Sequence, residues 1–444
     1  MNRYYQQGMS TLLITSMLLV VALIFSLASY KNLFYQIKRT QNEVLVRQAH
    51  WLSEGGIECG FAKIYQDRDL SKLDSTLHPN YLKSECISKL NLSSIDIEPL
   101  IDGKQYKLLS IFDTDKLYKA ISKIIDVSPK ASTGTIKSTA DIFVYGTATF
   151  NPPDPGEEVD DGWKCKVARY KRYFKISGSI HNQEFTDVNN LPYSDFVSNN
   201  KHCITSHKSI STTNLLQDFE NDTDIDPFYE LFNVDKSKWV SVRDSAYYDF
   251  AIIKEDKVEN ITGSNEFVKR VTDCGNKIAK EIKDNKKLNI WVDGSCELEG
   301  TGLVAVKDAS DKTENGVLIL VHNGVFSING AGSIKGVSFH FNQPSVFSPE
   351  EKDWKGLIAY GILNRTPTNF DVMLNNTYDP VPSVKTAAYF QNGAFSFSGG
   401  QFYDLDGQMA LFNNGLDLKY NRDYIERSMQ MGEPRWQKGS WHDF

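Results

Sequence analysis

The chain has 444 residues, of which 41% are hydrophobic and 24% charged, close to the averages of soluble globular proteins. This composition excludes collagen-like, disordered and polytopic membrane proteins, and the length predicts two globular domains or one globular and one repetitive domain. The 49 basic and 56 acidic side chains leave a formal net charge of −7. Because nucleic-acid binding needs a strong basic footprint, nucleic acid is disfavoured as a partner.

The first element in chain order is an uncharged apolar segment. Residues 9–29 (MSTLLITSMLLVVALIFSLAS) carry no charged side chain, and a helix of this length spans about 30 Å, the thickness of a bilayer hydrocarbon core. Apolar residues continue at helical spacing, among basic ones, up to Gly55-Gly56. The pattern predicts one helix over about residues 9–54, with a transmembrane half at 9–29 and an amphipathic half within 30–59.

Two explanations of this segment are open from the residues alone. A plain signal anchor would tether an exported domain, but Lys31, Lys38 and Arg39 would then lie outside, against the positive-inside tendency. A helix that ends up packed against other proteins is under less such pressure. The apolar run also begins abruptly after Gly8, as a peptidase that cuts at a glycine would require.

The sequence GMSTLLITSMLLVVAL resembles the leader and helix start of type IV pilins and pseudopilins, and it is most similar to PilX-type minor pilins. Residues 49–54 (AHWLSE) stand where that family has the end of its helix. The resemblance implies a leader at residues 1–8, a prepilin peptidase that cuts after Gly8, and N-methylation of Met9. It also implies a single-pass inner-membrane protein that moves into a pilus at the cell surface, with most of the chain periplasmic or extracellular.

One position departs from the pattern of the major pilins. They carry a glutamate at the fifth mature position, inside the bilayer, where a carboxylate is costly and is kept only for a specific partner. Here that position is Leu13, as in some minor pilins and in pseudopilins that cap a fibre. The substitution implies a tip or initiating subunit that packs on other pilins through its N-terminal helix. The alternative is a protein that does not assemble.

Six cysteines follow the apolar segment, and an even number in an exported chain predicts disulfides, although many different pairings are possible. Pairing between sequence neighbours would close short loops, each worth about 3 kcal/mol. The predicted pairs are Cys59–Cys86, Cys165–Cys203 and Cys274–Cys296. Free buried thiols are the alternative. No CxxC motif occurs, and the sequence predicts neither a metal site nor a cofactor.

Residues 60–286 are predicted to form an α+β lobe of the pilin type. Residues 140–150 and 165–176 alternate apolar and polar side chains around a turn-rich loop, which predicts a strand, a loop and a returning strand. Asp226-Pro227 predicts the start of a short helix, and Ser264 predicts the cap of a second one.

The last third of the chain repeats a template of Asx-Gly followed by apolar side chains at every second position. The copies are residues 293–300, 323–330 and 392–399, with a weaker one at 413–418. Each copy predicts a tight turn and a short strand that cannot bury its apolar face alone. Such strands predict a β-solenoid-like domain over residues 287–444, with a β-sandwich as the alternative. The uneven spacing predicts an insertion around residues 343–386.

The C-terminal region also resembles that of larger PilX-type proteins, which end in a W–GSW–aromatic tail like residues 435–444 (RWQKGSWHDF). The fold expected is α+β, with a long pilin-type helix, a disulfide-stapled middle lobe and a β-solenoid-like domain. The function expected is a minor pilin or pilin-like tip subunit, without catalytic residues, that initiates or caps assembly and presents a surface to a host or other ligand. The alternative is a membrane-tethered polysaccharide enzyme with Asp404 and Asp406 as its carboxylates, although no known catalytic motif is present.

Overall fold

The computed structural model describes residues 5–67, 70–73, 78–100, 104–115, 117–128, 132–185, 189–255, 257–260, 267–429 and 434–444. The chain is α+β and divides into two units. The first unit is Met1–Ser128 with Glu433–Phe444, and the second unit is Pro129–Gly432. Residues 1–4 of the expected leader lie outside the described part.

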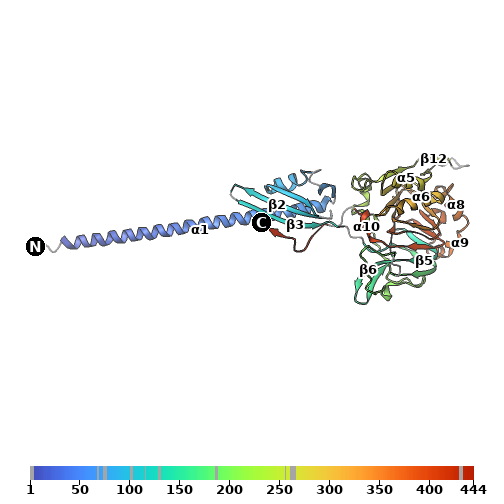
Figure 1. The fold of residues 1–444 in the computed structure, drawn as a ribbon, viewed down its shortest axis with the longest axis horizontal. Coiled ribbons are helices and arrows are strands. Elements are labelled where there is room, and N and C mark those ends of the chain that lie inside the picture. Colours follow the sequence, from blue (N-terminus) through green and yellow to red (C-terminus); the bar gives the residue numbers. More distant parts are fainter. Residues whose placement is uncertain are drawn as a thin grey trace. The chain divides into compact units, whose positions relative to one another are not determined.

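The first unit is organised by helix α1 (Tyr5–Asp67), a single helix of 63 residues (Figure 1). Among the described residues, it is the one helix that is long and apolar enough to cross a membrane. Residues 10–48 are all exposed, whereas Ala49, Ser53 and Ile57 are buried against the rest of the unit. Helix α1 therefore has a free part and an anchored part.

Helix α1 runs past Gly55-Gly56, where the sequence predicted its end. The reason is close packing, since a Cβ atom at Gly56 would lie 2.2 Å from Oγ of Ser110, and one at Gly60 would lie 2.7 Å from Cδ2 of Leu108. Glycine costs a helix up to about 1 kcal/mol, but here it lets the helix lie directly on the neighbouring strand.

An antiparallel sheet covers the anchored part of α1. Three consecutive strands pair in order, and two short strands from the end of the chain pair with the third. They are β1 (Ser94–Pro99), β2 (Gln105–Thr114), β3 (Leu117–Asp126), β25 (Arg435–Trp436) and β26 (His442–Asp443). Trp436 stacks on Phe61 of α1 with ring centroids 4.5 Å apart. The C-terminal tail thus belongs to the first unit, which corrects the expectation of one domain over residues 287–444.

Short helical segments link α1 to this sheet. They are η1 (Leu70–Leu73), η2 (Lys83–Ile87) and α2 (Ser88–Leu90). The disulfide Cys59–Cys86 ties α1 to η2. The disulfides Cys165–Cys203 and Cys274–Cys296 lie in the second unit. All three predicted pairs are confirmed.

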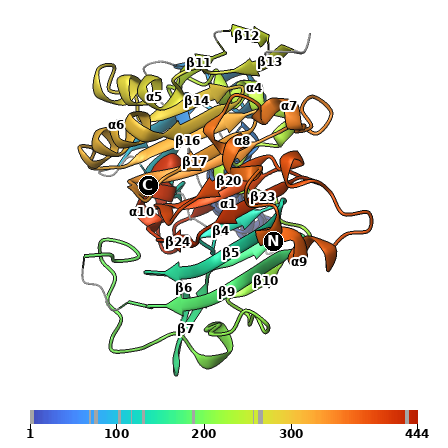
Figure 2. The same ribbon diagram turned by 90° about the vertical axis from the view of Figure 1, so that its right-hand side faces the viewer.

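The second unit contains two large sheets in which every strand pair is parallel (Figure 2). The first sheet has the order β10 (Phe219–Asn221), β8 (Ala168–Tyr170), β4 (Ile136–Ser138), β22 (Gly400–Asp404), β19 (Gly336–Phe341), β16 (Val317–His322), β14 (Asn289–Asp293) and β11 (Ala251–Lys254). The second has the order β15 (Cys296–Glu299), β17 (Phe326–Asn329), β20 (Tyr389–Asn392), β23 (Met409–Asn413), β5 (Asp141–Phe150) and β24 (Leu416–Leu418), with β9 (Phe174–Asn182) also on β5.

The chain alternates between these two sheets, so that β14 leads to β15, β16 to β17, β22 to β23, β4 to β5, and β8 to β9. Figure 2 shows the resulting layers, from β11 and β14 at the top of the view to β5 and β9 towards its bottom. Strands β4 and β5 come early in the sequence, yet they pair with β22 and β23. The boundary expected between residues 286 and 287 therefore does not separate the two units.

The expected returning strand after residue 150 is also wrong, because β9 pairs with β5 in parallel. Between them the chain forms an antiparallel hairpin of β6 (Asp154–Val159) and β7 (Gly162–Lys166) and then passes through β8 in the other sheet. The crossover brings β9 back in the same direction as β5.

The Asx-Gly template marks corners where one strand gives way to the next. A Cβ atom at Gly324 would lie 2.3 Å from the carbonyl carbon of Gly294, and one at Gly393 would lie 2.5 Å from the carbonyl oxygen of Gly330. The corner of one layer therefore lies directly on the corner of the next, and only glycine leaves room for that contact. Two of the corner strands, β18 (Gly332–Ile334) and β21 (Phe395–Phe397), form a further parallel pair.

Helices occupy the sequence between the strands of the second unit. The expected insertion is confirmed, since it contains α7 (Glu351–Trp354), α8 (Ile358–Leu363), α9 (Thr368–Asn375) and η5 (Val384–Thr386). The other segments are η3 (Thr205–His207), α3 (Pro227–Phe232), η4 (Lys236–Lys238), α4 (Trp239–Arg243), α5 (Cys274–Lys283), α6 (Gly300–Asp311) and α10 (Arg422–Ser428).

Of the two helix starts predicted for the middle of the chain, one is confirmed. The carboxylate of Asp226 accepts a hydrogen bond from the backbone N–H of Tyr229 at the start of α3. The second helix, α5, begins only at Cys274. Before it, β13 (Phe267–Arg270) pairs with β12 (Lys257–Asn260), and the predicted cap Ser264 lies outside the described residues.

We predict opposite effects of two glycine-to-alanine substitutions in the second unit. Gly275→Ala should lower the free energy of unfolding by about 1–3 kcal/mol, because its Cβ atom would lie 2.7 Å from the carbonyl carbon of Gly302 on the adjacent helix. Gly361→Ala in α8, with no atom within 4 Å of its Cβ, should raise it by about 0.5–1 kcal/mol. Denaturant titration of the full chain measures both, and equal stability of the two variants would contradict the packing of α5 on α6.

Candidate functional site

The candidate site is the surface of α1 that the described part of the chain leaves uncovered. In its first part, large apolar side chains point outward on all sides of the helix. The exposed ones are Leu12, Leu13, Ile14, Met17, Leu18, Leu19, Val20, Val21, Leu23, Ile24, Phe25 and Leu27. A contiguous apolar surface of this extent is stable only when lipid or protein covers it.

In its second part, α1 carries one continuous row of apolar residues along one side, while Phe34, Tyr35, Leu45 and Val46 are exposed outside that row. This outer stripe consists of Tyr30, Leu33, Ile37, Val44 and Trp51, all exposed. Trp51 is the largest of them and is 69% exposed. At about 100° per residue, the five side chains fall within one sector of the helix surface.

The outer stripe faces away from the sheet. Trp51 and Gly60 are nine residues apart, which is about two and a half turns, so they point in opposite directions. Gly60 contacts Leu108 on β2, and the stripe therefore lies on the side of α1 opposite the sheet. The first unit buries one side of its helix and leaves the other apolar and open.

The charged residues of α1 between residues 30 and 51 lie outside the outer stripe. Arg47 pairs with Glu43 one turn earlier, with Nη2 and Oε1 2.9 Å apart, and the ammonium group of Lys38 lies 4.9 Å from the ring centroid of Phe34. These interactions are local to the helix surface. They leave the stripe itself without charge.

The anchored end of α1 is held by contacts from several elements. Oγ of Ser53 donates to the carbonyl oxygen of Lys119 on β3 (3.3 Å), and Nζ of Lys123 pairs with Oε1 of Glu58 (2.9 Å). His50 meets Trp441 of the C-terminal tail edge to face, with centroids 6.1 Å apart. Together with the Cys59–Cys86 disulfide, these contacts fix the direction in which the free part of α1 leaves the unit.

The sequence-predicted site residues at the start of the chain all lie in α1. Gly8 and Met9 are within its first turns, so the expected cleavage point falls inside a helical segment. Leu13 is 56% exposed and belongs to the all-round apolar part. The outer stripe could be predicted from the sequence, because apolar residues follow helical spacing after residue 29. The orientation of the stripe relative to the sheet could not be predicted from the sequence.

The two carboxylates of the enzyme alternative lie in different environments. Asp404 is buried, accepts hydrogen bonds from Lys236 (3.4 Å) and Thr139 (3.3 Å), and has a pKa raised by that burial. Asp406 is exposed and pairs with Lys171 at 3.0 Å. One oxygen of each carboxylate is thus engaged by groups of the chain itself, while Oδ2 of Asp404 is buried without a hydrogen-bond partner among the described residues.

A buried charge network, not foreseen from the sequence, lies at one side of the same sheet. Nζ of Lys137 on β4 lies 3.3 Å from Oε2 of Glu230, and Arg169 on β8 bonds Glu230 at 2.7 Å and also pairs with Asp222. Burial lowers the pKa of the Lys137 ammonium group. The charges satisfy one another, which is the usual condition for burying them.

Within the residues that the structure describes, no group of three or more His, Cys, Asp or Glu side chains is placed to hold a metal ion.

Comparison of the chain with protein-family models, with curated proteins and with solved structures finds no match in any of the three. The role of the chain is therefore inferred from the residues and the geometry of its two units.

One buried histidine gives the second unit a defined pH dependence. His340 on β19 is fully buried, and its Nε2 donates to the carbonyl oxygen of Gly324 at 2.9 Å. Burial lowers its pKa from 6.5 to about 3. Below pH 6.5 the His340 imidazole binds a proton in the unfolded chain but not in the folded chain. The free energy of unfolding should therefore fall by about 2 kcal/mol between pH 6.5 and about pH 5.

We predict that His340→Phe removes this share of the pH dependence. The difference in the free energy of unfolding between the wild type and the variant should shrink as pH falls from 6.5 to about 5. Thermal unfolding at several pH values measures it. His181→Gln is the matched control, since His181 is exposed and should leave the wild-type slope unchanged. A His340→Phe slope identical to the wild type would contradict the prediction.

Proposed function

We propose that this chain is a minor pilin or pilin-like tip subunit of a type IV pilus or a related pseudopilus. It is made as a prepilin, cut after Gly8 by a prepilin peptidase and N-methylated on Met9. Residues 9–29 hold it in the inner membrane, and α1 then enters a fibre by packing against the helices of other pilins. Most of the chain is periplasmic before assembly and extracellular afterwards.

The observation that carries the proposal is that the outer stripe extends along α1 past the part that a bilayer can cover. A membrane covers about 30 Å of helix, or about 20 residues. Residues 30–48 continue for about 28 Å more, and they are exposed, with the apolar stripe on one side. Lipid cannot cover this stripe while residues 9–29 span the membrane. A helix that served only as a tether would gain nothing from it, whereas packing against sibling helices buries it.

The first unit supports this role by its construction. The anchored end of α1 lies on an antiparallel sheet that the C-terminal tail extends beyond β3, and the stripe lies on the opposite side of the helix. A partner helix can therefore approach α1 along the stripe without displacing the sheet.

The tip placement is supported by Leu13 and by the size of the second unit. Without a carboxylate at position 13, α1 brings no buried charge that requires a partner amine. The strands of the second unit alternate between two parallel sheets, which favours a β-solenoid-like architecture over a β-sandwich of antiparallel sheets. Such a unit is bulky for the interior of a fibre, and at its end it would present an adhesive surface to a host or other ligand.

We predict that the chain isolated from its native membrane begins at methylated Met9. Mass spectrometry of the N-terminal peptide measures this directly, and Gly8→Val should leave the chain uncut because the peptidase requires the glycine. A wild-type peptide that contains Met1, or one that begins after Ser29, would instead support a plain anchor or a cleaved signal.

We predict that assembly depends on the outer stripe and not on the apolar character of α1 in general. Val44 belongs to the stripe, and Val46 lies about 200° away on the helix, yet their exposed fractions are nearly equal at 47% and 45%. Val44→Lys should reduce the amount of chain that co-isolates with sheared filaments by about tenfold or more, because it places an ammonium group in the helix contact.

Val46→Lys is the matched control, with the same change of side chain at the same exposure. It should leave co-isolation within about twofold of the wild type. Immunoblots of the filament and membrane fractions measure both variants at equal membrane levels. Equal behaviour of the two variants would contradict the docking role of the stripe.

A further inference from the structure

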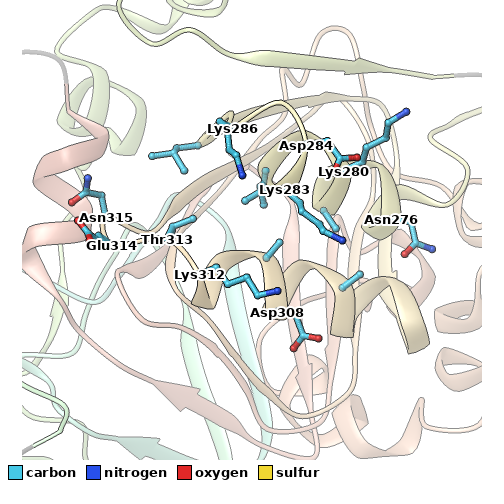
Figure 3. A pocket seen from close by; sticks show the side chains of 15 residues that line it. Asn276, Lys280, Lys283, Asp284, Lys286, Asp308, Lys312, Thr313, Glu314 and Asn315 are labelled. Atoms are coloured by element: carbon cyan, nitrogen blue, oxygen red, sulfur yellow. The ribbon is translucent and has the colours of Figure 1, made fainter.

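A groove of about 700 Å³ lies in the second unit between α5 and α6 and the segments that follow them. Its buried lining consists of small or aliphatic side chains such as Ala279, Ile282 and Ala309, while its rim consists of the polar side chains labelled in Figure 3. The rim carries the four lysines Lys280, Lys283, Lys286 and Lys312. Figure 3 shows Lys283, Lys286 and Lys312 extending into the space between the two helices.

These lysines have no partner within the described chain. None of the four makes an ion pair or a side-chain hydrogen bond among the described residues, although many other lysines of the second unit do. The groove also contains Asp284, Asp308 and Glu314, but in Figure 3 the carboxylate of Asp308 points away from the space that the lysines enter. Unpaired ammonium groups gathered on one side of a groove repel one another, and an anion relieves that repulsion.

The ends of the two helices account for only part of this arrangement. Lysines near a helix C-terminus can neutralise the dipole or bond the last carbonyls, and Lys280 and Lys283 are in the last turn of α5, while Lys312 is the C-cap of α6. However, no ammonium group of the four bonds a carbonyl oxygen in the described part of the chain. Lys286 lies beyond the end of the helix and still lines the groove.

The side chains that line the groove indicate which class of polyanion it can bind. Among the described residues, no aromatic ring lines it, so it lacks the stacking platform on which single-stranded nucleic acid depends. Asn276 and Asn315 on the rim can both donate and accept hydrogen bonds, as sugar hydroxyl groups require, and Thr313, whose hydroxyl donates to the carbonyl oxygen of Ser310, can accept one. Lysines supply charge-assisted hydrogen bonds to carboxylate or sulfate groups. We propose that this groove binds an acidic polysaccharide, with Lys283, Lys286 and Lys312 holding its anionic groups.

This proposal does not depend on a pilin role, because it concerns the second unit and not α1. The test uses the full chain in an uncharged detergent, with polygalacturonate as a carboxylate probe, dextran sulfate as a sulfate probe and dextran as the uncharged polymer. The wild type should bind at least one charged polymer and not dextran. The binding should weaken as salt is added, since the contacts are electrostatic.

The triple variant Lys283→Gln, Lys286→Gln, Lys312→Gln should lower the affinity for the bound polymer by about tenfold or more. The matched control is Lys175→Gln, Lys238→Gln, Lys254→Gln, which removes the same charge from exposed lysines outside the groove and should change affinity by no more than about twofold. Circular dichroism of both variants checks that they fold.

Three outcomes would overturn the proposal. The first is that neither charged polymer binds the wild type. The second is that the two triple variants lose affinity equally, which would mean a general charge effect. The third is that a single-stranded oligonucleotide binds more tightly than either polysaccharide at the same salt concentration, which would mark the groove as a nucleic-acid site.

Discussion

The first unit depends on one constraint: the chain cannot cover the apolar surface of its own helix. Residues 10–48 of α1 are exposed, and they include slightly more than half of the large exposed apolar side chains among the described residues. The sheet, the Cys59–Cys86 disulfide and the C-terminal tail all act on the other end of α1. They hold the helix at residues 49–67. The apolar surface of residues 10–48 stays uncovered by the unit. A bilayer is thick enough to cover only the first half of that surface, and we propose a protein partner for the second.

The second unit is stabilised by a different principle, the stacking of layers in register. Its two parallel sheets bury apolar side chains from every layer in common cores, such as Ile290, Ile319 and Phe412. At the corners, glycine lies on glycine, as Gly324 does on Gly294. A side chain at such a corner would push two layers apart along the whole stack, which is why the Asx-Gly template recurs.

The features that could be predicted from the sequence are those whose cause is local. The apolar run of α1, the cap of α3 by Asp226 and the pairing of neighbouring cysteines each depend on residues close together in the chain. The direction of β9 relative to β5, and the return of the tail to β3, depend on contacts between residues far apart, for which local spacing holds no signal. Gly56 shows how the two conflict, since its low helix propensity predicts an end that tertiary packing overrides. The position of the outer stripe opposite the sheet could not be predicted, because it depends on contacts between residues far apart in the chain. The same holds for the lysine groove between α5 and α6.

Two surfaces of this chain, the outer stripe and the lysine groove, are unfavourable in free energy as they stand, and folding does not require either of them. This is the physical argument that each binds a partner. Folding alone gains nothing from an exposed Trp51 at the end of an apolar stripe, because water disfavours that surface. Nor does folding require Lys283, Lys286 and Lys312 to stay unpaired around one groove, since each could have been paired with a carboxylate in a chain whose net charge is −7. We propose an apolar helix as the partner of the first surface and an anionic polymer as the partner of the second. Since each surface lies within its own unit, a substitution that disrupts one leaves the residues of the other unchanged.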